Sequence, residues 1–308
     1  MPDPDLITAV VSAIKESKKY RDTSEATIRA LAVEALRQHK KVKPAVKAVR
    51  ARLHSIMAPY LGDPDYPAAA TTLTTAYASH DPALIRQTCW EIMAHHLSTR
   101  ERLPILAEFY QQIFAITGQP QVLLDIACGL NPLALPWMEL LPEPGGTVGT
   151  PATAEGNLPA QAGLLTEPAE GGTVGTPATA GIVDFYAYDI HEPRIHFLNH
   201  FFELNGLRPR AILQDVALNF PQEEGDVALF LKEMPRFERN YHGLGRPLLE
   251  ALRVRHIVLS FPEVSTHGGR NLVNRYRDFC HQLIANHDWP ITELLFEGEL
   301  VFCIEKKQ

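Results

Sequence analysis

The spacing of apolar residues divides the chain into two parts. Up to residue 117, apolar positions recur every three or four residues, as Leu6, Val10 and Ile14 do, which is the spacing of one face of an α-helix. The pattern predicts an all-helical N-terminal domain at residues 1–117. A segment rich in Gly, Pro and Asp at residues 61–70 indicates a possible subdivision of this domain.

The second part, residues 118–308, alternates short runs of Val, Ile, Leu, Phe and Tyr with helix-length segments. We expect strands at 121–127, 183–190, 210–216, 227–233, 256–262, 291–298 and 299–306. The first five are separated by helix-length connections, which favours parallel strands with crossovers, whereas the last two meet at Gly298 and predict a hairpin. The fold class is therefore α/β: a doubly wound, seven-stranded Rossmann-like sheet of five mainly parallel strands plus a C-terminal hairpin, preceded by the helical domain.

Residues 142–181 fit neither pattern. This segment is dominated by Gly, Pro, Thr and Ala, and the sequence GGTVGTPATA occurs in it twice, at 145–154 and 171–180. Such a composition cannot bury enough apolar surface to offset the entropy lost on ordering. We expect a low-complexity surface insert between the first and second strands, and the sequence assigns it no function.

The charge of the chain is unevenly distributed. Its net charge is −7, yet the first 52 residues hold twelve Lys and Arg against six acidic residues, and residues 40–54 contain no acid at all. Such a surface suits the phosphates of a nucleic acid, although a solvated helix face has the same composition. The candidate nucleic-acid-binding residues are Lys18, Lys19, Arg21, Lys40, Lys41, Lys43, Lys47, Arg50 and Arg52.

Other features point to a cytoplasmic protein. No apolar run approaches the ~20 residues of a membrane span, and acids stand where a secretory signal carries positive charge. The four cysteines lack the spacing of a zinc site, so we expect no structural metal and no membrane partner. His191, His196 and His200 follow helical spacing, for which a polar helix face is favoured over a metal site.

The first strand of the α/β part leads into a turn that is a candidate ligand site. The stretch LLDIACGLNPLALPWM, residues 123–138, passes from an apolar run through Gly129 and Pro132 into helical spacing. Free amides at the start of that helix suit a carboxylate or a phosphate. The turn lacks the glycine pattern of a dinucleotide site, because Ala127 stands at a required glycine. An ordinary tight turn remains the alternative.

Acidic residues end the second and third expected strands. Asp189 stands where an acid accepts hydrogen bonds from ribose hydroxyls once the insert is discounted, and Asp215 could accept one from an adenine amino group. Either aspartate alone could cap the following helix. Taken together with the turn, the three strand ends suggest S-adenosylmethionine, with its amino-acid part at the turn, its ribose on Asp189 and its adenine near Asp215.

Five blocks, in order, then resemble a known family. They are HLSTRERLPIL (96–106), DIACGLNPLALPWM (125–138), YDIHEPRIHFLNHFF (188–202), LFLKEMPRFER (229–239) and LSFPEVSTHGGR (259–270). Together they resemble the Arm/Rmt family of aminoglycoside-resistance 16S rRNA guanine-N7 methyltransferases. The resemblance implies a methyltransferase domain after residue 117 that uses S-adenosylmethionine, and methylation of N7 of the guanine at rRNA position 1405 in the assembled 30S subunit. The basic N-terminal residues would then contact RNA.

The resemblance also implies site residues. For the cofactor, Arg102 would pair with the methionine carboxylate, against the alternative of a surface ion pair with Glu101. The remaining cofactor residues would be Asp125, Ala127, Cys128, Gly129 and Asn131 for the methionine part, Asp189 and Ile190 for the ribose, and Asp215 and Val216 for the adenine. The target-base candidates are Lys232, Glu233, Phe261, His267 and Arg270. Phe261 would stack on a flipped base, and Arg270 would donate to O6 or hold a phosphate. No general base is expected, because guanine N7 carries a lone pair and no proton.

Two rival functions remain open. The first is a methyltransferase that acts on another rRNA or tRNA nucleotide. The second is a noncatalytic RNA or ribosome adaptor that keeps the fold. A nicotinamide-dependent oxidoreductase is disfavoured, because the glycine fingerprint is missing. In the main reading the partner is 16S rRNA within the 30S subunit, DNA is not a partner, and the protein is a monomer.

Overall fold

The computed structural model describes residues 1–57, 62–140, 184–264, 269 and 271–307. The repeated insert expected at 142–181 and the target-base candidates His267 and Arg270 lie outside the described residues. None of the helices in the described ranges has the length and hydropathy of a membrane span.

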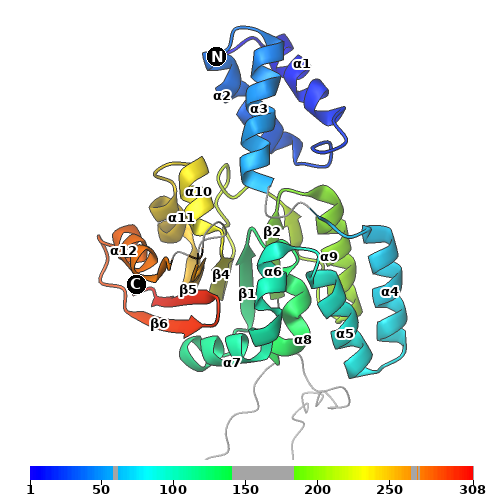
Figure 1. Ribbon diagram of the computed structural model, residues 1–308, viewed down its shortest axis with the longest axis vertical. Helices are drawn as coiled ribbons and strands as arrows, with labels where there is room; N and C mark the ends of the chain where they lie inside the picture. Colours follow the sequence, from blue (N-terminus) through cyan, green and yellow to red (C-terminus); the bar gives the residue numbers. More distant parts are fainter. Residues whose placement is uncertain (58–61, 141–183, 265–268, 270, 308) are drawn as a thin grey trace, which may run out of the picture.

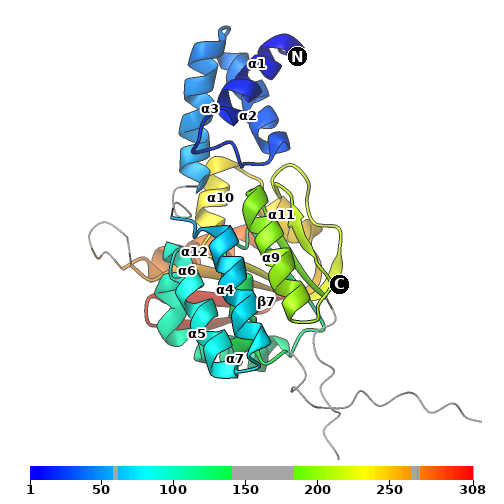
Figure 2. The same ribbon diagram turned by 90° about the vertical axis from the view of Figure 1, so that its right-hand side faces the viewer.

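Three helices at the N-terminus form a unit with its own core. They are α1 (Pro4–Lys15), α2 (Glu25–Gln38) and α3 (Val42–Met57). Their apolar stripes meet in a cluster that includes Val10, Ile14, Leu31 and Leu53. The unit projects from the rest of the molecule and stands above the sheet on the foot of α3 (Figures 1 and 2). We call residues 1–57 the three-helix unit.

The remaining expected helices pack on the sheet. They are α4 (Tyr66–Ala78), α5 (Pro82–Met93), α6 (Leu97–Arg102) with a 3-10 turn at Leu103–Ile105, and α7 (Leu106–Thr117). Leu73, Cys89 and Phe109 share one apolar cluster with strand residues such as Phe185. The boundary between the core of the three-helix unit and the core on the sheet therefore lies near the expected break at 61–70, and not at residue 117.

The central sheet has the predicted strands and connections. Its order is β3-β2-β1-β4-β5-β7-β6, with β1 (Val122–Ile126), β2 (Asp184–Asp189), β3 (Ala211–Leu213), β4 (Glu224–Leu231), β5 (Arg253–Pro262), β6 (Ile291–Phe296) and β7 (Glu299–Glu305). The first five strands are parallel, and β7 inserts antiparallel between β5 and β6. The prediction of five parallel strands and a terminal hairpin is confirmed.

Helices cover both faces of the sheet, which explains the continuous apolar runs of its strands. The helices α4, α5, α7 and the short α8 (Leu135–Met138), with α9 (Glu192–Leu204), cover one face, and α10 (Met234–Asn240), α11 (Gly245–Ala251) and α12 (Val273–Leu283) cover the other. Neighbouring residues of β1 therefore enter different cores, Leu123 on one face and Leu124 on the other. The carboxyl ends of β1, β2 and β4 point toward the three-helix unit (Figure 1).

Candidate functional site

The turn after β1 holds an unusual backbone conformation. Ala127 has φ +53° and Gly129 has φ +56°, both in the left-handed region. This region costs a residue with a side chain about 1–2 kcal/mol, so the strain at Ala127 must be offset by its surroundings. One such contact is the hydrogen bond from the Gly129 amide to Asp189 Oδ2, at 3.1 Å. This hydrogen bond joins the turn to the last residue of β2.

Asp189 is a nearly saturated acceptor. Its side chain is 6% exposed, and it accepts hydrogen bonds from the Gly129 amide, from the His191 amide at 2.9 Å and from Arg194 Nη1 at 2.7 Å. A carboxylate offers about four acceptor positions. Counting donors from the described residues, one position therefore remains for a ligand hydroxyl, on the oxygen that already accepts from His191.

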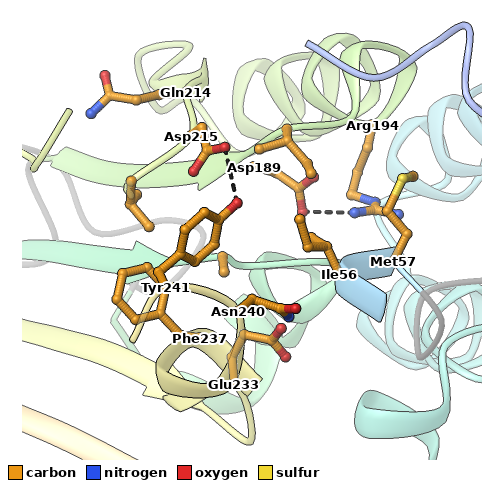
Figure 3. A pocket seen from close by; sticks show the side chains of 13 residues that line it. Ile56, Met57, Asp189, Arg194, Gln214, Asp215, Glu233, Phe237, Asn240 and Tyr241 are labelled. Atoms are coloured by element: carbon orange, nitrogen blue, oxygen red, sulfur yellow. Dashed lines mark hydrogen bonds and ion pairs between the residues drawn. The ribbon is translucent and has the colours of Figure 1, made fainter. Parts of the chain in front are cut away.

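A pocket opens beside Asp189, and we call it the main pocket. It is lined by Ile56, Met57, Ala127, Asp189, Ile190, Arg194, Gln214, Asp215, Val216, Glu233, Phe237, Asn240 and Tyr241. Figure 3 shows Asp189 and Asp215 on one side of the space, with Tyr241, Phe237 and Glu233 facing them. The pocket is open to solvent, and the space within it, solvent at its mouth included, is about 620 Å³.

The far end of the main pocket combines an acid with aromatic rings. Asp215 Oδ1 accepts a hydrogen bond from the Ala217 amide at 3.0 Å, and Oδ2 accepts one from the Tyr241 hydroxyl at 3.3 Å. Burial raises the pKa of Asp215, and these hydrogen bonds oppose the shift. The rings of Phe237 and Tyr241 lie 5.3 Å apart between centroids. An apolar wall beside a single acceptor suits a flat heterocycle that bears an amino group.

A second, smaller pocket lies on the other side of Ala127, and we call it the side pocket. It is lined by Ser98, Thr99, Arg102, Asp125, Ala127, Cys128, Asn131 and Leu231. Ala127 lines both pockets, so the turn after β1 separates an apolar chamber from a polar one. Together the two pockets fit an elongated ligand with an aromatic end and a charged end.

Arg102 lies at the back of the side pocket. It is 2% exposed, its Nε lies 3.1 Å from both carboxylate oxygens of Glu299, and its Nη1 donates to Asn131 Oδ1 at 3.0 Å. The alternative of a surface ion pair with Glu101 is wrong, because the guanidinium turns inward and finds its acid on β7. Its Nη2 also donates to Glu299 Oε1 at 2.5 Å. Three of its five N–H groups are therefore used among the described residues, which leaves two for a ligand.

Asn131 and Asp125 complete the polar lining. Asn131 Oδ1 also accepts from the Tyr110 hydroxyl at 2.8 Å, and Asn131 Nδ2 donates to Asp125 Oδ2 at 2.8 Å. Burial raises the pKa of Asp125 to about 8, against the opposing effects of Asn131 and Arg102. Near neutral pH Asp125 is therefore mostly protonated. A protonated Asp125 adds no negative charge to that of Glu299, and Arg102 and Asn131 supply donors that suit a carboxylate.

Lys232 and Glu233 follow β4 directly, as expected. Lys232 has φ +58°, and its amide donates to the carbonyl oxygen and to Oγ of Ser260, both at 3.0 Å. Its ammonium group lies 2.9 Å from Glu101 Oε2 and 3.2 Å from Glu299 Oε2. Glu233 pairs with Arg236 and lines the main pocket. Two paired strands, β1 and β4, thus both leave the sheet through a left-handed residue beside the pockets.

Phe261 does not have the expected role. Its side chain is fully buried, with its ring stacked on Tyr276 at 4.8 Å and edge-on to Phe279 and Phe302. The expectation that it stacks on a flipped base is wrong for this structure, because Phe261 points into the core on the α12 face of the sheet. Alternation along β5 decides the side on which each residue lies.

The structure brings together most of the remaining candidates. Ala127, Asp189, Ile190, Asp215, Val216 and Glu233 line the main pocket, and Arg102, Asp125, Cys128 and Asn131 line the side pocket. Sequence reasoning missed Phe237 and Tyr241, although their spacing of four residues in the helical segment after β4 was a usable signal. It also missed Arg194. Ile56 and Met57 carried no such signal, because only the folded chain brings α3 to the pocket.

The predicted basic residues lie on the three-helix unit. Those that point into solvent are Lys18, Lys19, Arg21, Lys40, Lys41, Lys43, Lys47 and Arg50. Arg52 is different. Its guanidinium lies 5.7 Å from the centroid of the Tyr241 ring, and its buried Nε finds no hydrogen-bond partner among the described residues. Arg52 therefore belongs to the junction beside the main pocket rather than to the open basic surface.

The three histidines of the α9 region are not gathered into one cluster. His191 precedes the helix beside Asp63, and His200 Nε2 lies 2.8 Å from Thr74 Oγ1. Within the described ranges, no group of three or more His, Cys, Asp or Glu side chains is placed to hold a metal ion.

Comparison with known proteins identifies the family. Residues 16–150 and 166–303 match the family model described as ribosomal RNA methyltransferase (FmrO). The chain belongs to this family. Over 306 residues, 98% of this chain and 97% of the relative, it is 31% identical to a 16S rRNA (guanine(1405)-N(7))-methyltransferase of Micromonospora echinospora. The family match includes most of the three-helix unit as well as the sheet.

Solved structures of similar proteins agree with this placement. The 16S rRNA methylase RmtB is 27% identical, covers 98% of this chain with 98% of its own, and has a TM-score of 0.68. The 16S rRNA methyltransferase RmtF, solved in complex with S-adenosyl-L-homocysteine, shares the fold at 24% identity and a TM-score of 0.71, with 99% of this chain and 100% of that chain covered. The resemblance to the Arm/Rmt methyltransferases and the predicted fold class are confirmed.

Proposed function

We propose that this member of the FmrO family transfers a methyl group from S-adenosylmethionine to N7 of guanine 1405 of 16S rRNA in the assembled 30S subunit. The similarity over nearly the whole chain to a 16S rRNA (guanine(1405)-N(7))-methyltransferase carries the proposal. The protein would act as a monomer in the cytoplasm, and its methylation would confer resistance to aminoglycosides. DNA and membranes are not among its proposed partners.

The two pockets fit S-adenosylmethionine. Asp189, which retains one acceptor position, would hold the ribose beside Ile190, and Asp215 with Val216 and Tyr241 would hold the adenine. At the other end, Arg102 and Asn131 would hold the methionine part in the side pocket. When bound, the cofactor supplies a methyl group on a positively charged sulfur, which reacts with a nucleophile.

The protein itself must supply position rather than proton transfer. Guanine N7 attacks through an in-plane lone pair and loses no proton, so no side chain is needed as a base. Holding two reactants in line can account for about 7–11 kcal/mol of a barrier. Enzymes that act on stacked bases commonly flip the base out, at a cost of a few kcal/mol.

The target base would be held at the end of β4. Lys232 and Glu233 leave the sheet there, and Glu233 lines the main pocket. His267 and Arg270 remain proposed contacts on the other side of the base. The exposed basic residues of the three-helix unit would hold the rRNA through its phosphates, because RNA helices are recognised largely by shape and backbone.

Radiolabelled methyl transfer tests this function. The purified protein is incubated with tritiated S-adenosylmethionine and, separately, with 30S subunits, 50S subunits, free 16S rRNA and bulk tRNA. We expect incorporation of about one methyl group per 30S subunit and little into the other substrates. Incorporation into tRNA or 50S subunits instead would identify the rival methyltransferase. The inactive variant for this assay is Asp189→Ala. Its matched control is Asp184→Ala, which removes a buried acid at the opposite end of β2.

A noncatalytic adaptor would behave differently. Calorimetry would then detect no binding of S-adenosylmethionine, or binding without turnover on any of these RNAs. Resistance is tested by expressing the wild type and Asp189→Ala in a susceptible bacterium. We expect only the wild type to raise the inhibitory concentration of aminoglycosides that bind the decoding region.

A further inference from the structure

The main pocket has walls from two separate cores. Most of its lining belongs to the sheet and α10, but Ile56 and Met57 come from the last turn of α3, in the three-helix unit. Figure 3 shows both side chains at the pocket, next to Asp189 and Arg194. Met57 is buried and belongs to the core of the three-helix unit, whereas Ile56 is half-buried beside that core. The unit that carries the basic surface therefore also closes the pocket.

The three-helix unit meets the sheet domain right beside this pocket. The Ser24 amide donates to the Ile190 carbonyl oxygen at 2.7 Å, and the Glu192 amide donates to the Asp22 carbonyl oxygen at 2.9 Å. These bonds form a short antiparallel bridge between Thr23 and His191. The bridge begins one residue after Asp189, so the proposed ribose acid lies at the junction itself.

A second set of contacts lies on the other side of the pocket. Ser55 Oγ donates to Asn240 Oδ1 at 3.0 Å, and the Arg52 guanidinium lies 5.7 Å from the centre of the Tyr241 ring. Thr23 Oγ1 lies 3.4 Å from the sulfur of Met57, which joins the bridge to the foot of α3. Asn240 and Tyr241 line the pocket as well.

We propose that Ile56 and Met57 are cofactor-contacting residues, and that cofactor binding fixes the three-helix unit on the sheet domain. The inference rests on the proposed function, because it takes the main pocket as the adenosine site. A ligand in this pocket touches both units at once, so it favours the docked arrangement over any other. The free-energy coupling is reciprocal: RNA that binds the docked basic surface must raise cofactor affinity by the same factor.

The first test measures binding of S-adenosylhomocysteine by calorimetry with the full chain. Truncating an apolar wall lowers affinity, so Ile56→Ala and Met57→Ala should each weaken binding about tenfold. The control is Val46→Ala, which removes methyl groups from α3 where it packs on the same core but away from the pocket. We expect this control to leave the affinity unchanged. Equal affinities for all four proteins would overturn the assignment.

The second test uses only the wild type and does not depend on how any variant folds. Hydrogen exchange of the peptide that contains Ser24 is followed by mass spectrometry, with and without saturating S-adenosylhomocysteine. Ser24 does not line the pocket, so slower exchange there reports docking of the three-helix unit. We expect slowing of roughly threefold or more at Ser24 and none in α12, no residue of which lines the pocket. Unchanged exchange at Ser24 with the ligand bound would overturn the coupling.

The two claims fail in distinguishable ways. If the wild type does not bind S-adenosylhomocysteine at all, the proposed function fails and the inference falls with it. If the wild type binds, but neither the α3 variants nor the exchange at Ser24 responds, only the inference fails. A ribosome-binding measurement is decisive for reciprocity: affinity for S-adenosylhomocysteine should rise when 30S subunits saturate the protein, and a constant affinity contradicts the proposal.

Discussion

Asp189 joins three parts of the site through one carboxylate. It accepts hydrogen bonds from the Gly129 amide in the turn after β1, from the His191 amide at the start of α9, and from the buried guanidinium of Arg194. Arg194 continues to Asp63 at 2.8 Å and to the Tyr66 hydroxyl at 3.1 Å. A buried cation needs such partners, because an unpaired one carries a large desolvation cost. Asp189 thus positions its neighbours, and it is also the residue that we propose holds the ribose.

The first prediction concerns this acid. Asp189→Ala should lower affinity for S-adenosylhomocysteine by roughly 100-fold, because hydrogen bonds to a charged group contribute about 1.5–3 kcal/mol each. Calorimetry measures the affinity. Asp184→Ala is the matched control: it removes an acid from the same strand that pairs with Arg208 and Arg210, away from the pocket. The account is contradicted if the two variants bind the ligand equally well.

The second prediction concerns the dependence of stability on pH. In the unfolded chain an aspartate titrates near about pH 4, whereas burial raises the pKa of Asp125 to about 8 in the native state. Between these values the native state holds a proton that the unfolded state has lost, so the contribution of Asp125 to stability falls as pH rises. Asp125→Asn removes this loss and keeps an oxygen for the hydrogen bond from Asn131.

Urea unfolding of the wild type and Asp125→Asn at about pH 5.5 and about pH 8.5 measures this effect. We expect the free energy of unfolding of the variant, relative to the wild type, to be higher at the upper pH by ~1 kcal/mol or more. A difference that stays constant across the two pH values would show that Asp125 titrates normally.

At the scale of elements, the ends of β1 and β4 are shaped alike. Ala127 and Lys232 both adopt positive φ, and both lie where paired parallel strands leave the sheet. Neither is glycine, so the surrounding contacts hold a backbone that costs energy. Glycine would avoid this cost but would have no side chain. At Lys232 the side chain reaches two carboxylates.

The third prediction tests this backbone. Ala127→Val places a β-branched residue in the left-handed region and should lower the free energy of unfolding by about 2 kcal/mol. Ala127→Gly relaxes the strain but gives the unfolded chain more freedom, so its stability should stay within about 1 kcal/mol of the wild type. Urea unfolding compares the three proteins. A valine variant as stable as the glycine variant would mean that the turn does not hold this conformation.

Most elements could be predicted from the chain alone. The strands are continuous apolar runs because helices cover both faces of the sheet, and their order along the chain predicted the parallel connections. Strand ends could also be predicted, which is why Asp189 and Asp215 were found. Phe261 was misjudged for a physical reason: position at a strand end does not say which face a side chain takes. Arg102 was predicted as a site residue, but its ion-pair partner was not, because Glu299 is 197 residues away along the chain.

At the scale of the whole molecule, what the sequence does not predict is how the three-helix unit docks. Periodicity predicted its helices, but not that the foot of α3 closes the main pocket, because that contact depends on two cores coming together. The division between cores near residues 61–70 was one of the predicted possibilities. Resemblance to a family added the target nucleotide, which no pattern of polar and apolar residues contains.

The fourth prediction concerns the basic surface of the three-helix unit. Reversing charge at Lys40, Lys43 and Arg50 to Glu should weaken binding to 30S subunits roughly 10–100-fold and reduce the slope of log affinity against log salt by about 2–3, as expected for lost phosphate contacts. Affinity for S-adenosylhomocysteine without RNA should not change, because these side chains do not line either pocket. Filter binding over a salt series measures the affinity for 30S subunits and its slope against salt.

The control for this prediction carries the same change of charge elsewhere. Arg253, Arg255 and Lys307 lie near the start of β5 and the end of β7, away from the carboxyl ends of the parallel strands. Their reversal to Glu should leave the salt dependence of ribosome binding almost unchanged. Equal losses in the two triple variants would mean that overall charge, and not this surface, determines binding.

The measurement that tests the central claim most directly is the position of the methyl group. 30S subunits incubated with the protein and S-adenosylmethionine are treated with borohydride and aniline, which cleave RNA at N7-methylguanine, and the break is mapped by primer extension. The account predicts a single new stop at guanine 1405, absent with Asp189→Ala. Cleavage at another guanine, or none while the cofactor binds, would contradict it.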